Sequence, residues 1–328
     1  MKHYNIPVFI PHLGCPHNCI FCNQKKITGQ ANPCTIEDAQ QEIERHLAFL
    51  PEGEKEISFF GGSFTAIPVK EQEEFLSLAK RYVAEGRVQG IRLSTRPDCV
   101  EPQTLERLQR YGVTTVELGV QSFCDEVLQK AGRGHSADCA VLACKRVKEA
   151  GFSLGIQLMC GLPEDCLEYD LYSAKLAKEL ADFVRIYPVL VLWETPLEQL
   201  YLEGRYQPLS LEEAVERTAR MKEELSPVLV IRTGLCTEDL REEDVADGPL
   251  HPAFGELVDA KVYDRQVREW LTGKETRGKT LLIVAPKGEH SKLSGHKKSN
   301  LKGWKQDYQF KQIRFLEGDS LHFSIQHE

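Results

Sequence analysis

Three cysteines, Cys15, Cys19 and Cys22, lie close together near the start of the chain, in the sequence Cys-Pro-His-Asn-Cys-Ile-Phe-Cys. They follow a short apolar run at residues 6–10, which predicts a β-strand. Three thiolates at this spacing can bind three irons of a cubane cluster, because soft sulfur ligands suit iron–sulfur clusters. The fourth iron would have no protein ligand, which leaves it open to a small chelating molecule.

Two other interpretations of these cysteines are a structural zinc site and an ordinary loop with buried thiols. A structural zinc ion normally takes four protein ligands. The sequence offers no fourth cysteine and no well-spaced histidine pair close by, although His12 and His17 are near. The iron–sulfur interpretation is therefore favoured.

The other eight cysteines show no compact ligand spacing, which disfavours a second cluster. We expect most of them to be small buried hydrophobic residues. They are Cys34, Cys99, Cys124, Cys139, Cys144, Cys160, Cys166 and Cys236.

The spacing Cys-x3-Cys-x2-Cys, with the aromatic Phe21 before the last cysteine, is the hallmark of the radical S-adenosylmethionine (SAM) superfamily, and the chain resembles that family over roughly its first 235 residues. The resemblance implies that the open iron of a 4Fe-4S cluster binds SAM through its amino and carboxylate groups. An electron from a reductant such as flavodoxin or ferredoxin would then cleave SAM and generate a 5'-deoxyadenosyl radical.

Three further sites fit a SAM pocket. Gly61, Gly62 and Ser63 follow a predicted strand, and glycines there let backbone groups approach a ligand closely. Gln121 is a polar residue at the end of an otherwise apolar strand, and a buried amide needs partners. Arg133 could pair with a carboxylate in a forked geometry. Each of these residues, taken alone, is also compatible with a structural role.

Several segments resemble the radical SAM domain of the Elongator catalytic subunit and, less closely, oxygen-independent coproporphyrinogen oxidase. The shared segments are Ser94–Asp98, Val116–Ser122, Gly132–His135, Gly161–Pro163 and Val184–Pro188. By that resemblance the residues expected to line SAM are Phe9, Phe21, Gly61, Gly62, Ser63, Gln121, Arg133 and Gln157. The Elongator subunit also carries an acetyltransferase domain, and no part of this sequence resembles one.

Short β-rich runs alternate with segments of helical period, which is typical of βα units around a parallel sheet. The expected strands are 6–10, 57–60, 90–94, 115–121, 153–159 and 183–189. The expected helices are 36–49, 69–85, 102–110, 138–150 and 168–180, with a further helix at 211–225 and an apolar run at 228–232. Six such units predict an α/β fold, a partial (β/α)6 TIM-like barrel, better than a closed barrel of eight.

The chain divides into a radical SAM partial barrel at 1–235, a connecting segment at 236–277 and a small α+β module at 278–328. The order of strands and helices in this module, with the basic turn Gly295–Lys298 between two helices, is similar to a KH-type RNA-binding fold. Lys298 stands where the KH loop has its second glycine. The alternative is a solvated basic face without a ligand. We expect Trp304 to be a core residue of the module.

The charge of the chain is unevenly distributed. The net charge is −8, yet residues 277–314 contain ten Lys or Arg and two acidic residues, which favours a polyanion as the partner of this end. No signal peptide or membrane span is predicted, and an odd number of cysteines disfavours a disulfide framework, so we expect a cytoplasmic protein.

The favoured hypothesis is a radical SAM enzyme, and one substrate that fits is a nucleoside of tRNA or rRNA docked through the basic module. The rival hypothesis is a non-catalytic iron–sulfur protein that binds RNA or regulates another process.

Overall fold

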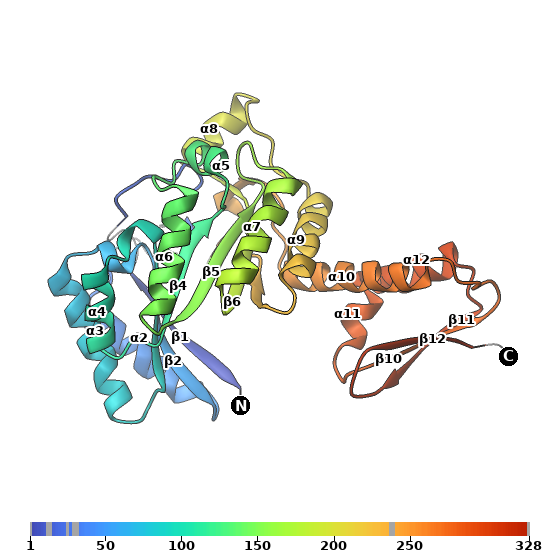
Figure 1. The fold of residues 1–328 in the computed structure, drawn as a ribbon, viewed down its shortest axis with the longest axis horizontal. Coiled ribbons are helices and arrows are strands. Elements are labelled where there is room, and N and C mark those ends of the chain that lie inside the picture. Colours follow the sequence, from blue (N-terminus) through green and yellow to red (C-terminus); the bar gives the residue numbers. More distant parts are fainter. Residues whose placement is uncertain (1, 11–14, 24–25, 28–32, 236–239, 327–328) are drawn as a thin grey trace.

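The computed structural model describes residues 2–10, 15–23, 26–27, 33–235 and 240–326. Its main element is a parallel sheet of seven strands that curls into a half-barrel (Figure 1). In the order in which they lie in the sheet, the strands are β1 (His3–Ile10), β2 (Glu54–Gly61), β3 (Gly90–Thr95), β4 (Thr115–Gln121), β5 (Ser153–Cys160), β6 (Phe183–Pro188) and β8 (Leu229–Thr233).

The predicted α/β half-barrel is confirmed, with one strand more than the six expected. The additional strand, β8, pairs in parallel with β6 and forms an edge of the sheet. The apolar run at 228–232 forms most of this strand, and at the edge of the sheet Leu229 and Ile231 remain 65% and 39% exposed.

Helices cover one face of the sheet, and Figure 1 shows α6, α7 and α9 lying across it. The helices that follow the strands are α2 (Ile36–Phe49), α3 (Val69–Ala84), α4 (Pro102–Arg110), α6 (Ala137–Glu149), α7 (Leu167–Leu180) and α9 (Leu211–Leu225). Their ends have sequence causes: Thr35 and Asp38 form a capping box at the start of α2, and Ser210 and Glu213 form one at the start of α9.

The strands alternate between two faces, as their period of two requires. Ile57 and Phe59 of β2 and Ile91 and Leu93 of β3 are fully buried in the core beneath the helices. The residues between them, such as Arg92, belong to the opposite, concave face. One face of the sheet therefore builds the core, and the other carries polar side chains.

Short elements close the edge at which the strands end. They are α5 (Asp125–Lys130), α8 (Pro196–Leu202), the strand pair β7 (Val191–Leu192) and β9 (Val245–Asp247), and the 3-10 helices η1 (Phe64–Ala66), η2 (Pro97–Cys99) and η3 (Glu242–Asp244). In Figure 1, α5 and α8 lie at the top of the half-barrel, above the carboxyl ends of the strands.

The C-terminal module has the predicted order of strands and helices. Its elements are β10 (Thr280–Ala285), α11 (His290–Ser294), η4 (His296–Lys298), α12 (Ser299–Asp307), β11 (Gln312–Glu317) and β12 (His322–Gln326). The central strand β10 pairs in parallel with β11 and antiparallel with β12. Trp304 is fully buried, as expected of a core residue. The similarity to a KH fold stays a prediction.

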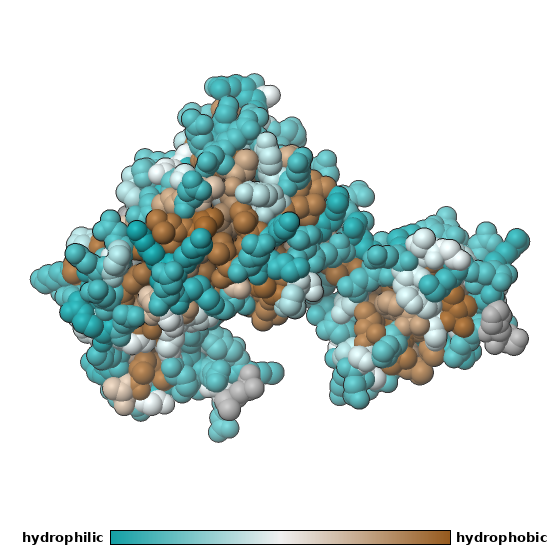
Figure 2. All heavy atoms as spheres, viewed as in Figure 1, coloured by the Kyte–Doolittle hydropathy of each residue, from teal (hydrophilic) through white to brown (hydrophobic). Residues whose placement is uncertain are grey.

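The helix α10 (Phe254–Leu271) connects the half-barrel to the module, and Figures 1 and 2 show the module to one side of the larger body. Phe254 and Val258 at one end of α10 pack against α9, whereas Val267 and Leu271 at the other end belong to the core of the module. The helix thus contributes to both cores.

The division of the chain at 235 and 277 stays a prediction, and residues 236–239, with Cys236, lie outside the described residues. Among the helices described, none is long and apolar enough to cross a membrane.

Candidate functional site

Cys15, Cys19 and Cys22 belong to the segment between β1 and α2, the cysteine loop, and its described part is anchored to two other elements. The Ile20 N–H donates to the Ala131 carbonyl at the end of α5, at 3.1 Å. The Ile20 carbonyl accepts the N–H of Leu197 in α8, at 2.9 Å. Cys19 is buried, Cys22 is half-buried and Cys15 is exposed. His12, which is close to these cysteines in sequence, lies outside the described residues.

The three cysteine side chains influence one another electrostatically. Burial, together with the nearby charges of Cys19 and Cys15, raises the pKa of the Cys22 thiol to about 12. Three thiolates so placed repel one another, and bound iron would relieve that repulsion. The donor set therefore fits an iron–sulfur cluster, although no group of three His, Cys, Asp or Glu side chains among the described residues is arranged to hold a metal ion as it stands.

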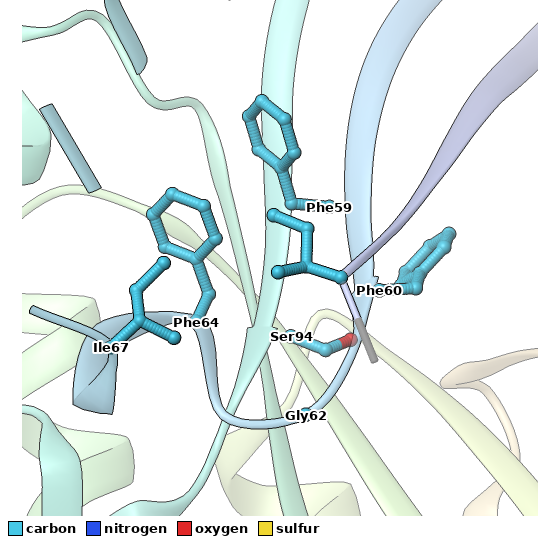
Figure 3. Close-up of a pocket in the computed structure, with 7 residues that line it drawn as sticks. Phe59, Phe60, Gly62, Phe64, Ile67 and Ser94 are labelled. Carbon is cyan, nitrogen blue, oxygen red and sulfur yellow. The ribbon is translucent and has the colours of Figure 1, made fainter. Parts of the chain in front are cut away.

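Gly61, Gly62 and Ser63 form the glycine-rich turn at the end of β2. This turn lies against Ile10, the last residue of β1. The Gly62 N–H donates to the Ile10 carbonyl at 3.2 Å. Gly61 has a φ of +115°, and a Cβ there would lie 2.9 Å from the same oxygen, so a side chain would push the two strands apart. Figure 3 shows Gly62, Phe60 and Ser94 around a small pocket beside this turn.

Ser63 uses its side chain within the protein. Its hydroxyl lies 2.8 Å from the Thr95 hydroxyl and accepts the Arg96 backbone N–H at 3.2 Å. The side chain is buried, with 1% exposure. Ser63 therefore fixes the turn to the end of β3, and any contact with a ligand would come from its backbone.

Other predicted residues lie on the concave face, near the carboxyl ends of the strands. The rings of Phe9 and Phe60 are 6.4 Å apart, on β1 and β2. The Gln157 amide donates to the Gln121 side-chain oxygen at 3.2 Å. Gln121 has a φ of 73°, an unusual backbone conformation for a residue with a side chain, where the register between β4 and β5 shifts. Phe21 packs instead in a small apolar cluster around Val127.

Arg133 lies between the cysteine loop and β4, and it is only 5% exposed. One guanidinium nitrogen, Nη1, donates to the Cys19 sulfur at 3.0 Å, and Nη2 donates to the Gly119 carbonyl. A Cβ on Gly119 would lie 3.1 Å from the Gln121 amide and 3.5 Å from the Arg133 guanidinium, so glycine leaves room for both. The Nε of Arg133 is buried and finds no acceptor among the described residues.

The seven other cysteines that the structure describes are less buried than expected. Cys144 and Cys160 are buried, and burial raises the pKa of both thiols. Cys34, Cys99, Cys124 and Cys139 are half-buried. Cys166 is exposed, because it occupies the N-cap position of α7 in a surface loop. The expectation of mostly buried thiols was therefore wrong among those described.

Sequence reasoning missed a ladder of charges across the concave face. Arg92 on β3 lies 2.7 Å from Glu56 on β2 and 2.8 Å from Glu117 on β4, and Arg185 on β6 lies 2.7 Å from Glu117. Each charge sits at the third position of its strand. The signal in the sequence was an acid or a base at the same place in four strands. The two negative and two positive charges of the ladder cancel, so these four residues give this part of the concave face no net charge.

Sequence reasoning also missed Arg96 and Asp98, which lie in the shared segment Ser94–Asp98. Arg96 is 4% exposed and follows β3 directly. Its Nε and Nη2 donate to the two oxygens of Asp98 at 2.9 and 3.0 Å. A charged pair directly after a strand, at the edge where the cysteines are expected, was the available signal.

Two family models match this chain. The model of the radical SAM superfamily matches residues 9–171, and the model of the radical SAM C-terminal domain matches residues 181–264. The second match extends across β6 and β8 into α10.

The chain is also similar in sequence to an archaeal and a yeast protein. A tRNA uridine(34) acetyltransferase of Methanocaldococcus infernus is 29% identical over 290 residues, which cover 74% of this chain and 53% of the relative. Elongator complex protein 3 of Saccharomyces cerevisiae is 28% identical over 187 residues, which cover 51% of this chain and 34% of that protein. The chain spans about half the length of the first of these relatives and about a third of the second.

Among solved structures, that of an archaeal Elp3 from Methanocaldococcus infernus, with an N-terminal deletion, has the same fold. The TM-score is 0.65 at 24% sequence identity, and the alignment covers 82% of this chain and 63% of the other.

Proposed function

Because this chain belongs to the radical SAM superfamily, we propose that it is an enzyme that binds a 4Fe-4S cluster and SAM and cleaves SAM reductively. The observation that supports this most directly is the position of the cysteine loop. The loop lies at the carboxyl edge of the sheet, beside the glycine-rich turn and within reach of the Arg133 guanidinium. Carboxyl edges of parallel strands are where α/β folds bind their ligands.

Each predicted residue has a role in this proposal. Cys15, Cys19 and Cys22 would hold the cluster, which when bound supplies the electron that cleaves SAM to a 5'-deoxyadenosyl radical. The backbone of Gly61 and Gly62 would receive the amino group of SAM, and Arg133 would pair with its carboxylate. The side chains expected to line the rest of SAM are those of Phe9, Phe21, Gln121 and Gln157, with Ser63 fixing the turn.

We propose an RNA nucleoside, in tRNA or rRNA, as the substrate. The relatives named above include a tRNA uridine(34) acetyltransferase, and the C-terminal module is basic. Lys297 and Lys298 are exposed at the turn between α11 and α12. Both have left-handed backbones, with φ of 51° and 62°, as in a tight turn.

This turn lies beside the half-barrel, which places it well for a long substrate. The ring of His296 in the turn is 6.1 Å from the ring of His251, in the segment that leads into α10. That segment borders the carboxyl ends of β6 and β8, through Pro188 and Gly234. An RNA held at the turn would thus need to cross only this junction to reach the concave face.

The proposed chemistry requires a source of electrons and a reducing compartment. We infer a reductant such as flavodoxin or ferredoxin, and a cytoplasmic location, where thiolate ligands stay reduced.

The proposal is tested by reconstituting the cluster anaerobically, reducing the protein with dithionite in the presence of SAM and measuring 5'-deoxyadenosine by mass spectrometry. We expect the product from the native chain and none from a Cys15→Ala, Cys19→Ala, Cys22→Ala variant. A protein with a full cluster and no 5'-deoxyadenosine would instead support the non-catalytic iron–sulfur protein.

The substrate is tested separately, by comparing modified nucleosides in RNA from cells with and without the protein. Loss of one modified nucleoside in the deleted strain would identify the product. An unchanged set of nucleosides would count against RNA as substrate without affecting the SAM chemistry.

A further inference from the structure

Arg96 lies where three segments of the proposed cofactor site meet. Its Nη2 donates to the main-chain carbonyl of Arg133, in the turn that follows α5, and its Nη1 points to the Cys19 sulfur at 3.8 Å. Its backbone N–H donates to the Ser63 hydroxyl at 3.2 Å. A single residue thus contacts the cysteine loop, the glycine-rich turn and the turn that carries Arg133.

Asp98 holds the Arg96 guanidinium in place. The two side chains form a forked pair, in which both carboxylate oxygens accept an N–H. One oxygen of Asp98 also lies 3.5 Å from Nε2 of His17, which belongs to the cysteine loop. A Cβ on Gly134 would lie 2.5 Å from the same His17 ring, so the loop packs closely on the turn that carries Arg133.

The direction of the Arg96 N–H groups matters for redox chemistry. Hydrogen bonds to the sulfurs of an iron–sulfur cluster, and positive charge near them, favour the more negative, reduced state and raise its reduction potential. Asp98 works in the opposite direction, because its negative charge offsets the guanidinium. The pair therefore supplies a donor to Cys19 without a large net charge.

We propose that Arg96 is a positioning residue that ties the three segments together and, by its N–H group toward the Cys19 sulfur, raises the reduction potential of the cluster that this sulfur would hold. Asp98 orients the guanidinium and limits that effect. The redox part of this inference rests on the proposed function. The contacts by which Arg96 holds the three segments together do not depend on it.

The redox part is tested by the midpoint potential of the cluster, measured by redox titration with electron paramagnetic resonance. Arg96→Gln should lower the potential, because the guanidinium and its positive charge are lost while Asp98 remains. Asp98→Asn should raise it, because the guanidinium keeps its charge and loses the offsetting carboxylate. Arg96→Lys should stay closer to the native value than Arg96→Gln. Shifts of the same sign in Arg96→Gln and Asp98→Asn, or no shift in either, would overturn the redox part.

The tie is tested without the cluster, by hydrogen exchange of residues 15–23 in the apo-protein. Arg96→Gln should increase exchange at Ile20 and Phe21. The control is Arg87→Gln, which breaks a similar forked pair, at 2.7 and 2.8 Å, between Arg87 in the loop after α3 and Glu44 of α2. Equal exchange in the Arg96 and Arg87 variants would overturn the positioning role. A native chain that takes up no cluster would contradict the proposed function, yet this second measurement would still decide the tie.

Discussion

At the scale of the residue, the three thiols of the cysteine loop are the groups on which the proposed chemistry depends. Anaerobically purified protein should contain about four irons, and changing Cys15, Cys19 or Cys22 to Ala should remove most of them, because each thiolate would hold one iron. The measurement is iron content together with visible absorbance.

Cys139→Ala and Cys144→Ala are matched controls for that experiment. Both residues belong to α6 and not to the cysteine loop, so iron content should not change. Equal iron in the native chain and in all three loop variants would contradict the assignment of the ligands.

Variants of Gln121 and Arg133 test the proposed SAM pocket, and the surroundings of each residue determine which substitution to use. Because Gln121 has a left-handed backbone, Gln121→Asn is preferable to an alanine variant, since asparagine tolerates that conformation and shortens the side chain. Arg133→Ala removes a donor to Cys19 as well, so its iron content must be measured in parallel.

Loss of a charge-assisted contact from a buried site costs about 1.5 to 3 kcal/mol, or roughly 10- to 150-fold in affinity, and Arg133→Ala should weaken SAM binding by that amount. Gln121→Asn should weaken it less. SAM titrations of cluster-loaded protein make the measurement, and unaltered affinity in both variants would assign the two residues structural roles.

At the scale of the element, a buried pair of carboxylates joins β5, α7 and α9. Arg217 of α9 lies 3.0 Å from Asp165, in the loop after β5, and 2.6 Å from Asp170 in α7. Burial raises the pKa of both carboxyls, and for Asp170 the neighbouring Asp165 raises it further. One arginine cannot fully balance two buried negative charges.

This pair predicts how stability changes with pH. Above the ordinary pKa of aspartate the folded chain binds more protons than the unfolded chain, so the contribution of Asp170 is full at low pH and is lost as pH rises through its raised pKa. The Asp170→Asn variant has no carboxyl at this position and therefore does not lose stability in this way as pH rises. The stability deficit of the variant should therefore shrink as pH rises above the ordinary pKa of aspartate, as measured by thermal unfolding at several pH values. A deficit that grows with pH would contradict the raised pKa.

At the scale of the whole molecule, α10 determines how the basic module can be tested. Residues 278–328 alone would lack Val267 and Leu271, which complete the core of the module around Trp304. Binding experiments therefore need the full chain, with changes confined to the surface.

RNA binding should depend strongly on salt, because neutralised phosphates release counterions. For single-stranded RNA the log-log slope is about −0.7 per phosphate contacted. Lys297→Ala with Lys298→Ala should flatten this slope by roughly one to two units and weaken binding about equally across RNA sequences. Lys70→Ala with Lys145→Ala, on the outer helices, is the control that should leave the slope unchanged. Unchanged binding in the Lys297 and Lys298 variant would mean that the turn is only a solvated basic surface.

The sequence by itself determined the features that short stretches of chain decide. Short β-rich runs predicted the strands, segments of helical period predicted the helices, and the spacing of Cys15, Cys19 and Cys22 predicted the kind of cofactor. The same local signals predicted the order of elements in the module and the burial of Trp304. The apolar run at 228–232 became the edge strand β8, whose apolar residues stay partly exposed.

Only the tertiary structure decided which charged groups meet. Arg96 and Arg133 stand 77 and 114 residues from Cys19 in sequence, and they reach the same sulfur because the turns after β3 and α5 end at one edge of the sheet. The pairing of Arg92 with Glu56 and Glu117 has the same cause, since the register of three strands sets it. Local pattern fixes where a strand or helix forms, whereas such contacts follow from how the strands align, which depends on packing across the whole sheet.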